Sequence, residues 1–477
     1  MTKTITIEPV TRIEGHGKVT IELDEKGNVS ETRLNIVEFR GVEKFCEGRL
    51  FWEMPLITSR VCGICPVSHH LAAAKAGDAI LGVDIPPAAK RLRELMHMGQ
   101  CIQSHSLHFF HLASPDLLFG MDADPAKRNV IGLIAEKPEI AIKGVTLRKY
   151  GQELIEALGG KKIHPNGAIP GGVNKALSPA EQDRFLQQID RVISDIVSAI
   201  ELAKDYYAQH KSEAASFAVF HSCYMGLVGK NGNLELYDGK LRIRDSKGAI
   251  LEDEVEPEDY LSIIEEKVED WSYLKFPYYK KWGYPAGVYR VGPLGRLNVA
   301  DRIATPLADK EFHNFKNLAG NGIVEGSLYY HYARLIEALY AAERAKELLE
   351  DELICSTEIR TGSTTLNEEG VGIIEAPRGS LIHHYWVDPK SGTIRKANLI
   401  VATGHNNAAM NRAVYEVAKE YVKGTKIAEG MLNRVEAAIR CYDPCLSCST
   451  HALGQMPMRI EVVSASGEIL GGTETRQ

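Results

Sequence analysis

The sequence predicts an α+β fold in which a central bundle of long helices is surrounded by antiparallel sheets and hairpins. Three observations lead to this class. Apolar and polar residues alternate near the start of the chain and in two later segments, as in strands. Two long stretches carry apolar residues at every third or fourth position, as in helices that bury one face. No internal repeat or clear linker interrupts the 477 residues, so we expect one domain over 1–477.

The first elements are predicted to be three strands followed by two helices. The strands are residues 4–10, 17–23 and 31–39. From 66 to 81, and again from 88 to 112, the apolar spacing changes to three and four. Pro66 suits a first helical turn, because its missing amide hydrogen has no helical partner at that position.

The middle of the chain carries the strongest helix signals. Ser178 and Glu181 form a capping box with proline at the first helical position, and an apolar stripe follows as far as Ile200. A second stripe begins at Leu328 and continues to about Leu353. Two such helices indicate a buried bundle.

Hairpins and one further helix complete the prediction. The hairpins are residues 234–251, with a turn at 237–240, and residues 380–403, with a turn at 388–392. Helical spacing returns at 407–422. The acidic run at 252–270 is interpreted as a solvated face.

Composition and charge disfavour several classes of protein. The formal net charge is −7 and no block of Lys and Arg stands out, so nucleic-acid binding is a weak alternative. No stretch approaches the ~20 continuous apolar residues of a membrane helix, so no span is expected. The start of the chain lacks the apolar core of a secretory signal. A cytoplasmic location is therefore expected, although export with a partner that carries a signal stays open.

The cysteines carry the strongest chemical signal. There are nine, and an odd number argues against a disulfide framework. Four form two CxxC pairs far apart in the sequence, Cys62 with Cys65 and Cys445 with Cys448. Four thiolates suit a zinc site, an iron–sulfur cluster, or a nickel or iron centre. Structural zinc and unrelated buried cysteines stay open at this point.

Residues beside the two pairs favour a rigid site. Proline follows Cys65 and precedes Cys445, which fixes backbone dihedrals next to both pairs. His69 lies one helical turn after Cys65, where its ring could donate a hydrogen bond to a ligand sulfur. A purely structural histidine is the alternative.

Four motifs spread from residue 12 to 451 resemble the large, catalytic subunit of nickel–iron hydrogenases. They are RIEGH at 12–16, RVCGICPVSH at 60–69, APRG at 376–379 and DPCLSCSTH at 443–451. Two finer features, FRGVEKFCEGR at 39–49 and WSYLKFPYYK at 271–280, look like the cytoplasmic NAD-linked bidirectional branch. The resemblance implies a hydrogen:NAD⁺ oxidoreductase.

The resemblance also implies how the cysteines hold the metals. Cys62 and Cys445 would be terminal ligands of nickel. Cys65 and Cys448 would bridge nickel to an iron that carries carbon monoxide and cyanide. Heterolytic splitting of dihydrogen there would release a proton to Cys445 and then to Glu14, a carboxylate suited to such a relay.

Further residues around the centre follow from the same resemblance. Arg378 would overhang the open coordination position, with Asp443 orienting it by an ion pair. Thr403 would hydrogen-bond a cyanide, and Pro377 and His69 complete the set expected at the cofactor.

Ser104 departs from the pattern, because many relatives outside this branch carry aspartate there. Arg378 would then have fewer acidic neighbours. This difference bears on oxygen tolerance and catalytic bias, not on the type of reaction.

A second metal and a group of histidines are also predicted. Glu43 and His451 resemble ligands of a magnesium-type ion, although imidazole is a less expected partner for a hard cation. The helix from 92 to 112 carries several side chains at ligand spacing: His97, Cys101, His105, His108 and His111. We interpret these histidines as core or supporting residues rather than another metal site.

The sequence continues beyond His451 for 26 residues, 452–477. The resemblance implies that this segment is a maturation peptide. A dedicated endopeptidase would remove it after nickel insertion, a step that also implies nickel chaperones.

Electrons released by the reaction need a path out of the chain. The five remaining cysteines lack iron–sulfur spacing, and the sequence has no GxGxxG fingerprint, so we expect no iron–sulfur cluster on this chain. The resemblance implies a partner in the form of an iron–sulfur small subunit, with flavin- and NAD(P)-binding diaphorase subunits beyond it.

Three alternatives stay open. A non-catalytic relative from the respiratory NADH dehydrogenase complex is disfavoured, because such subunits have lost the metal cysteines. A zinc-stapled scaffold belongs to a different class and would contain zinc without nickel or iron. Within the family, branches linked to a deazaflavin coenzyme, NADPH or sulfur share the central motifs.

Overall fold

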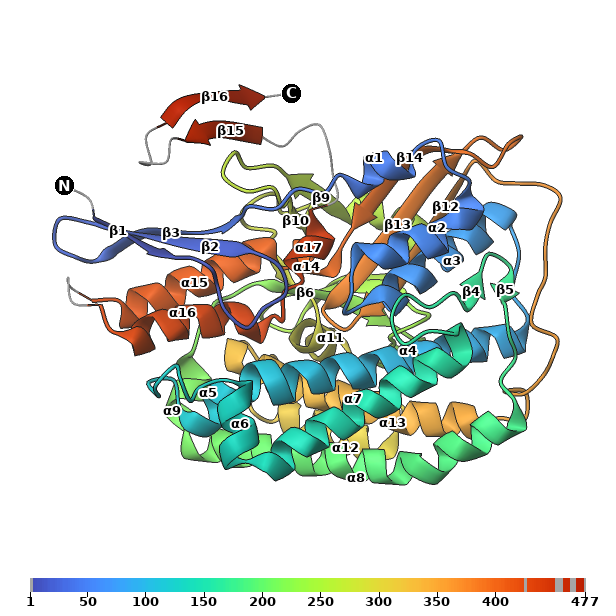
Figure 1. Cartoon of the computed structure of the whole chain (residues 1–477), viewed down its shortest axis with the longest axis horizontal. Coiled ribbons are helices and arrows are strands. Elements are labelled where there is room, and N and C mark those ends of the chain that lie inside the picture. The colour runs from blue at the N-terminus through green and yellow to red at the C-terminus, as the bar shows by residue number, and fades with distance from the viewer. Residues whose placement is uncertain (1–2, 424–426, 451–457, 464–468, 476–477) are drawn as a thin grey trace.

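Long helices and antiparallel sheets surround α17 (Leu446–Ser449), beside which a segment near the N-terminus meets one near the C-terminus through the bridge between residues 14 and 445 (Figure 1). The structure is a computed structural model that describes residues 3–423, 427–450, 458–463 and 469–475, with side chains described for 4–423 and 427–450. The predicted α+β class is confirmed: a helical layer lies below the sheets in the view of Figure 1.

The helical layer is the predicted central bundle. Its members are α4 (Pro87–Leu107), α7 (Pro138–Gly159), α8 (Pro179–Gln209), α12 (Pro306–Lys316) and α13 (Tyr330–Glu350). Helix α4 packs against α7 and α13, and α13 also packs against α8 and α12. The capping box of α8 forms as predicted, since the Ser178 hydroxyl accepts from the Glu181 amide and the Glu181 carboxylate accepts from the Ser178 amide.

Two three-stranded sheets flank the meeting point of the chain ends. The first is β1 (Lys3–Ile7), β2 (Gly17–Leu23) and β3 (Val29–Ile36), against which α15 (Asn407–Tyr421) and then α16 (Glu429–Cys441) pack. The second is β12 (Glu369–Ala376), β13 (Gly379–Val387) and β14 (Ile394–Ile400), covered by α3 (Pro66–Leu81). Gly372 permits this close cover, because a Cβ there would lie 2.1 Å from the Ala72 carbonyl oxygen.

Smaller sheets and short helices complete the described elements. The four-stranded sheet has the order β11 (Tyr289–Arg290), β6 (Cys223–Val228), β7 (Lys240–Arg244), β8 (Ile250–Val255). The two-stranded sheets are β4 (Ala168–Ile169) with β5 (Gly172–Val173), β9 (Ile264–Lys267) with β10 (Phe276–Tyr279), and β15 (Met458–Val463) with β16 (Ile469–Thr475). The short helices are α1 (Val42–Cys46), α2 (Met54–Thr58), α5 (Ser114–Phe119), α6 (Val130–Glu136), α9 (Lys211–Ser216), α10 (Tyr260–Ile263), α11 (Pro293–Val299), α14 (Ala402–His405) and α17 (Leu446–Ser449).

Most predicted elements are present, but the position predicted for one hairpin turn, 237–240, is wrong. The hairpin is β7 with β8, and its turn is at 245–249, where the Asp245 carboxylate accepts two amides. At 236–238 the Glu235 carboxylate instead accepts three consecutive backbone amides. This local turn lies in the longer connection between the paired strands β6 and β7, so it is not the turn of the β7–β8 hairpin.

Two further predictions need correction. The helix predicted to 112 leaves the α-helical pattern at Leu107 and continues as a π-helix, His108–Ala113. The acidic run at 252–270 is not wholly solvated, because Tyr260, Ile263 and Ile264 within it are buried.

A buried ion cluster joins the first and last parts of the chain. Arg12 and Arg440 both pair with Asp116, at 2.5 Å and 3.0 Å, and Asn433 donates to the same carboxylate. Arg12 stands two residues before Glu14, so this cluster fixes the segment that carries the predicted proton acceptor.

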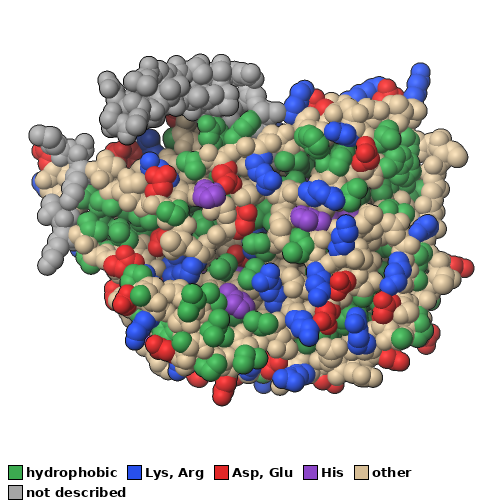
Figure 2. Space-filling view, viewed as in Figure 1, with side chains coloured by type: hydrophobic (Ala, Val, Ile, Leu, Met, Phe, Trp, Pro, Cys, Tyr) green, Lys and Arg blue, Asp and Glu red, His purple; other side chains and the backbone are tan. Residues whose placement is uncertain are grey.

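The surface is mixed in character. On the face shown in Figure 2, Lys and Arg are interspersed with Asp and Glu and with hydrophobic side chains. Within the described residues, no helix has both the length and the apolar character that crossing a membrane requires.

Candidate metal centre

The four paired cysteines converge at the centre of the molecule. Their sulfur atoms lie within 4.8 Å of one another, and all four side chains are buried. The Cys62 and Cys445 sulfurs are 3.3 Å apart, and those of Cys65 and Cys448 are 3.8 Å apart. Among the described residues, this is the one cluster found with three or more possible metal-ligating side chains.

The first pair is held by a helix start and by α4. Cys65 is the N-cap of α3, with Pro66 at the first helical position as predicted. The backbone amides of Ile64 and Cys65 donate to the Cys62 sulfur, at 3.2 and 3.1 Å. From α4, Gln100 and Gln103 both donate to the Ile64 carbonyl at 2.9 Å. The loop between the two cysteines is therefore fixed from both sides.

The second pair lies directly against the N-terminal segment. Cys445 precedes α17, and residues 14 and 445 form a parallel bridge. The Cys445 thiol donates to Glu14 Oε2 at 2.9 Å, and the Ser447 amide donates to the same oxygen at 3.2 Å. Gly15, at φ +84°, permits this approach, because a Cβ there would lie 2.8 Å from that of Leu446.

Arg378 occupies the turn between β12 and β13. The hairpin is tight, since Ala376 pairs with Gly379, which leaves Pro377 and Arg378 as the turn residues. The guanidinium of Arg378 is buried; it donates to Asp443 Oδ1 at 3.0 Å and to Ser104 Oγ at 3.2 Å. Burial alone would lower the pKa of Arg378, but the charges of Asp443 and the cysteines raise it above its usual value. The structure thus brings Arg378, Asp443 and the four sulfurs together.

A buried ion network supports this turn and was missed from the sequence. Arg296 on α11 donates twice to Glu337 on α13, at 2.6 Å each, and once to Glu375 on β12, at 2.7 Å. It also donates to the carbonyls of Ala376 and Pro377. The three charged side chains are fully buried. The backbone of the turn that carries Arg378 is therefore held in place by the buried guanidinium of Arg296.

The other predicted site residues are placed differently. The Thr403 hydroxyl accepts from the Cys445 amide at 2.9 Å, a contact the sequence did not indicate, so the bond to cyanide stays a prediction. His69 is buried on α3 with its Nδ1 3.1 Å from His383 Nε2. Glu43 accepts from the Leu399 amide at 2.7 Å. His451 lies outside the described residues, so the predicted magnesium-type site stays a prediction.

The helix histidines have protein partners. His97 bonds the Glu375 carbonyl at 2.9 Å, His105 lies 3.2 Å from Glu337, and His108 bonds the Arg440 carbonyl at 2.8 Å. Burial lowers the pKa of His97 to about 3 and that of His105 to about 4, so both rings are neutral. These contacts agree with their interpretation as core residues.

The donor set fits soft metal cations. Although burial raises the pKa of Cys62, hydrogen bonds from the three other thiols lower it well below its usual value. Burial raises the pKa of Cys445 and of Cys448. Buried sulfurs this close cannot all be anionic without cations, because each further thiolate repels the first. Nickel and iron would supply that charge, and thiolates are the ligands that soft metals select.

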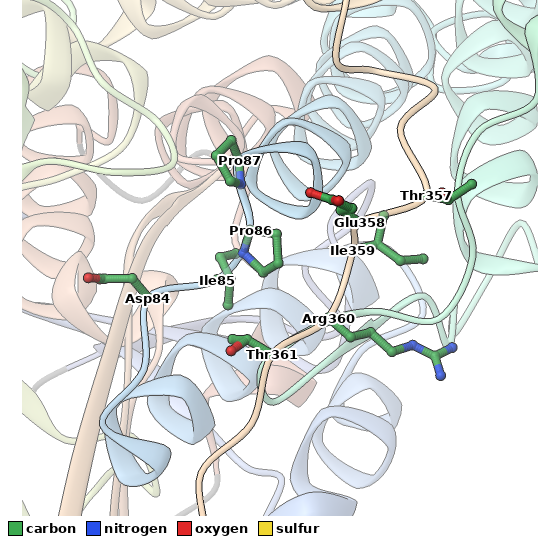
Figure 3. Close-up of a pocket in the computed structure, with 9 residues that line it drawn as sticks. All are labelled: Asp84, Ile85, Pro86, Pro87, Thr357, Glu358, Ile359, Arg360 and Thr361. Carbon is green, nitrogen blue, oxygen red and sulfur yellow. The ribbon is translucent and has the colours of Figure 1, made fainter.

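A surface pocket lies beside the cluster. It encloses about 440 Å³ and is lined by Gly63, Glu14 and Ser447 among others. A second cavity of about 850 Å³, between residues 84–87 and 357–361, contains none of the described candidate residues (Figure 3). There Arg360 points away from Pro86 and Pro87 (Figure 3). The larger of these two cavities is therefore not the one beside the cysteines.

Comparisons with known proteins agree with this geometry. A family model described as nickel-dependent hydrogenase matches residues 40–137 and 217–451, and one described as HoxL-like matches residues 4–39. The chain is 46% identical over 485 residues to the NAD-reducing hydrogenase HoxS subunit beta of Cupriavidus necator, covering 98% of this chain and 99% of the relative. It is 44% identical over 479 residues to one subunit of the F420-non-reducing hydrogenase of Methanothermobacter marburgensis, with the same coverage.

Solved structures give the same result. The crystal structure of an NAD⁺-reducing [NiFe]-hydrogenase in the H2-reduced state superposes with a TM-score of 0.92 and 48% identity, over 94% of this chain and 99% of that one. Relatives that align from end to end, and family models that span most of the sequence, show that this chain belongs to the nickel-dependent hydrogenases as a nickel–iron hydrogenase large subunit.

Proposed function

We propose that Cys62, Cys65, Cys445 and Cys448 hold a nickel–iron centre whose iron carries carbon monoxide and cyanide. The buried convergence of the four sulfurs is the observation that carries this proposal. When bound, the centre supplies the reversible heterolytic splitting of dihydrogen into protons and electrons. Cys62 and Cys445 would be the terminal ligands of nickel, and Cys65 and Cys448 would bridge to iron; the sulfurs are 3.3 Å apart in the first of these pairs and 3.8 Å apart in the second.

The chain's own residues then handle proton and charge. The Cys445 sulfur holds the released proton and passes it to Glu14 Oε2, which lies within hydrogen-bond reach at 2.9 Å. Arg378, held by Asp443 and Ser104, keeps a fixed cation beside the reacting position and stabilises developing negative charge. Thr403, Pro377 and His69 shape the surroundings of the iron ligands.

A hard cation and a maturation step complete the proposal. Glu43 and His451 would bind a magnesium-type ion near the end of the mature chain. Nickel chaperones would load the centre, and an endopeptidase would then remove residues 452–477.

The electrons leave through partner subunits. An iron–sulfur small subunit would receive them, and flavin- and NAD-binding diaphorase subunits would pass them to or from NAD(P) in the cytoplasm. The 48% identity to an NAD⁺-reducing structure supports this coupling. The alternative is coupling within a deazaflavin-, NADPH- or sulfur-linked hydrogenase. A relative named sulfhydrogenase 2 subunit alpha, from Pyrococcus furiosus, is 32% identical over 451 residues, which supports the sulfur-linked branch. The name of the 44% identical relative, F420-non-reducing, speaks against deazaflavin coupling. Assaying the purified complex with hydrogen and each acceptor in turn separates these branches.

Infrared spectroscopy of the purified holo-complex tests the centre. Metal-bound carbon monoxide and cyanide absorb between the main protein and water bands, where side chains scarcely absorb. We expect such bands together with nickel and iron by elemental analysis. Zinc without nickel or iron, and no such bands, would instead favour the zinc-stapled scaffold.

A further inference from the structure

Glu14 is followed by two more ionisable groups on the way to the surface. Ser447, whose amide donates to Glu14, uses its hydroxyl to donate to Glu38 Oε2 at 3.0 Å. The other carboxylate oxygen of Glu38 lies 2.5 Å from His16 Nδ1. The Glu38 side chain is 26% exposed and that of His16 is 73% exposed. Burial thus decreases stepwise from Cys445 to the imidazole.

Glu14 and Glu38 also face the same pocket. The cavity of about 440 Å³ beside the cluster is lined by Glu14, Glu38 and Ser447, and a polar cavity of this size can hold water. A carboxylate and a proton donor bridged by one water are within transfer reach. The direct contacts of Ser447 and the shared pocket therefore connect the same two carboxylates.

The other basic side chains around this pocket form hydrogen bonds with backbone carbonyls. Arg40 donates to the carbonyls of Val61 and Ser447, and Arg60 donates to the Leu56 carbonyl. His164 bonds the Ser59 carbonyl at 3.0 Å. In the described part of the chain, none of these basic side chains forms an ion pair with Glu38, so His16 is the basic partner of that carboxylate.

We propose that Glu38 and His16 form the outer half of the proton route, which receives protons from Glu14 and exchanges them with solvent. This inference rests on the proposed function, because it needs a proton released at Cys445. The proton passes from the Glu14 carboxyl through pocket water to the Glu38 carboxylate and then to His16 Nδ1. The opposite ring nitrogen releases a proton to bulk water, and no electron moves with it. The hydrogen bond and charge of Glu38 raise the pKa of His16 from its usual 6.5, which favours proton pick-up near neutral pH.

The first test is Glu38→Gln in the purified holo-complex. The amide keeps the size and the hydrogen bond from Ser447 but cannot take up a proton. We expect hydrogen-oxidation turnover to fall at least about tenfold, with a larger solvent deuterium isotope effect. Added imidazole should restore part of the turnover by carrying protons into the pocket. Glu31→Gln is the matched control, because Glu31 lies on β3, which ends shortly before Glu38, and pairs with the partly exposed Arg33 at 2.7 Å.

A second readout does not depend on turnover. In the full chain labelled with ¹⁵N-histidine, Glu38→Gln should lower the NMR titration midpoint of His16 toward its usual value, and Glu31→Gln should leave it in place. Unchanged turnover, isotope effect and His16 titration in Glu38→Gln would overturn the route. Absence of metal-ligand infrared bands in the wild-type complex would instead count against the proposed centre, so the two failures are distinguishable.

Discussion

The buried network around Arg296 gives a quantitative prediction. Glu337→Gln keeps the side-chain volume but replaces one carboxylate oxygen with an NH2 group that faces the guanidinium. Two bonds of 2.6 Å connect the wild-type pair, and both side chains have 0% exposure. Breaking a buried pair costs about 3–5 kcal/mol, and the remaining Glu375 contact favours the lower end of that range. For 477 residues the unfolding entropy is roughly 1 kcal/mol/K, so Tm should fall by about 3 °C.

Scanning calorimetry of the full chain measures this shift. Glu347→Gln is the matched control, because Glu347 is on the same helix α13 and pairs with Arg344 at 2.8 Å, but with both side chains about a third or more exposed. An exposed pair contributes about 0–1 kcal/mol, so the control should shift Tm by less than about 1 °C. If Glu337→Gln melts no lower than the control, the buried network does not stabilise the fold as argued.

Three further outcomes are expected. Glu14→Gln should lower hydrogen-oxidation turnover about 10²- to 10⁴-fold while nickel and iron contents stay unchanged, since the amide still accepts from Cys445 but cannot take a proton; near wild-type turnover would contradict the relay. Arg378→Lys should cost about 10²- to 10³-fold in turnover at unchanged metal content, because one ammonium cannot replace two guanidinium nitrogens that reach different partners; metal loss would point to a structural role. Burial opposes the charge of Asp116, but Arg440 and Arg12 lower its pKa below the usual 3.8. The ion pairs of Asp116 therefore stabilise the fold fully at pH values above 3.8, and this stabilisation is lost as the pH falls through the folded-state pKa. The stability difference between wild type and Asp116→Asn, measured by denaturant unfolding, should therefore be large at pH 7 and shrink below about pH 4, and a difference independent of pH would contradict this sign.

Local patterns predicted much of the fold. The capping box at Ser178 and the turn at 388–392 depend on nearby side chains, so both appear where the sequence indicates. The turn predicted at 237–240 failed because the Glu235 carboxylate accepts three successive amides there, so this segment belongs to the connection between β6 and β7 rather than to the β7–β8 hairpin. The π-helix after Leu107 also has no simple periodic signature in the apolar residues.

The candidate centre was partly visible in the sequence. The CxxC spacing and the flanking prolines identified the four cysteines, because both are local features. The partners of Arg296 were not identified, since Glu337 and Glu375 lie far from it in sequence and a single charged residue more often lies at the surface. One signal was present: Glu375 follows two isoleucines and precedes alanine, an unusual place for a carboxylate unless it is paired.

Nickel-edge X-ray absorption of the purified holo-complex, compared with Cys62→Ser and Cys445→Ser variants, tests the central claim most directly. The account predicts a nickel ion surrounded by sulfur from both ends of the chain, with sulfur replaced by a lighter atom or nickel lost in each variant. A nickel environment that neither substitution changes would show that the two CxxC pairs do not share one centre.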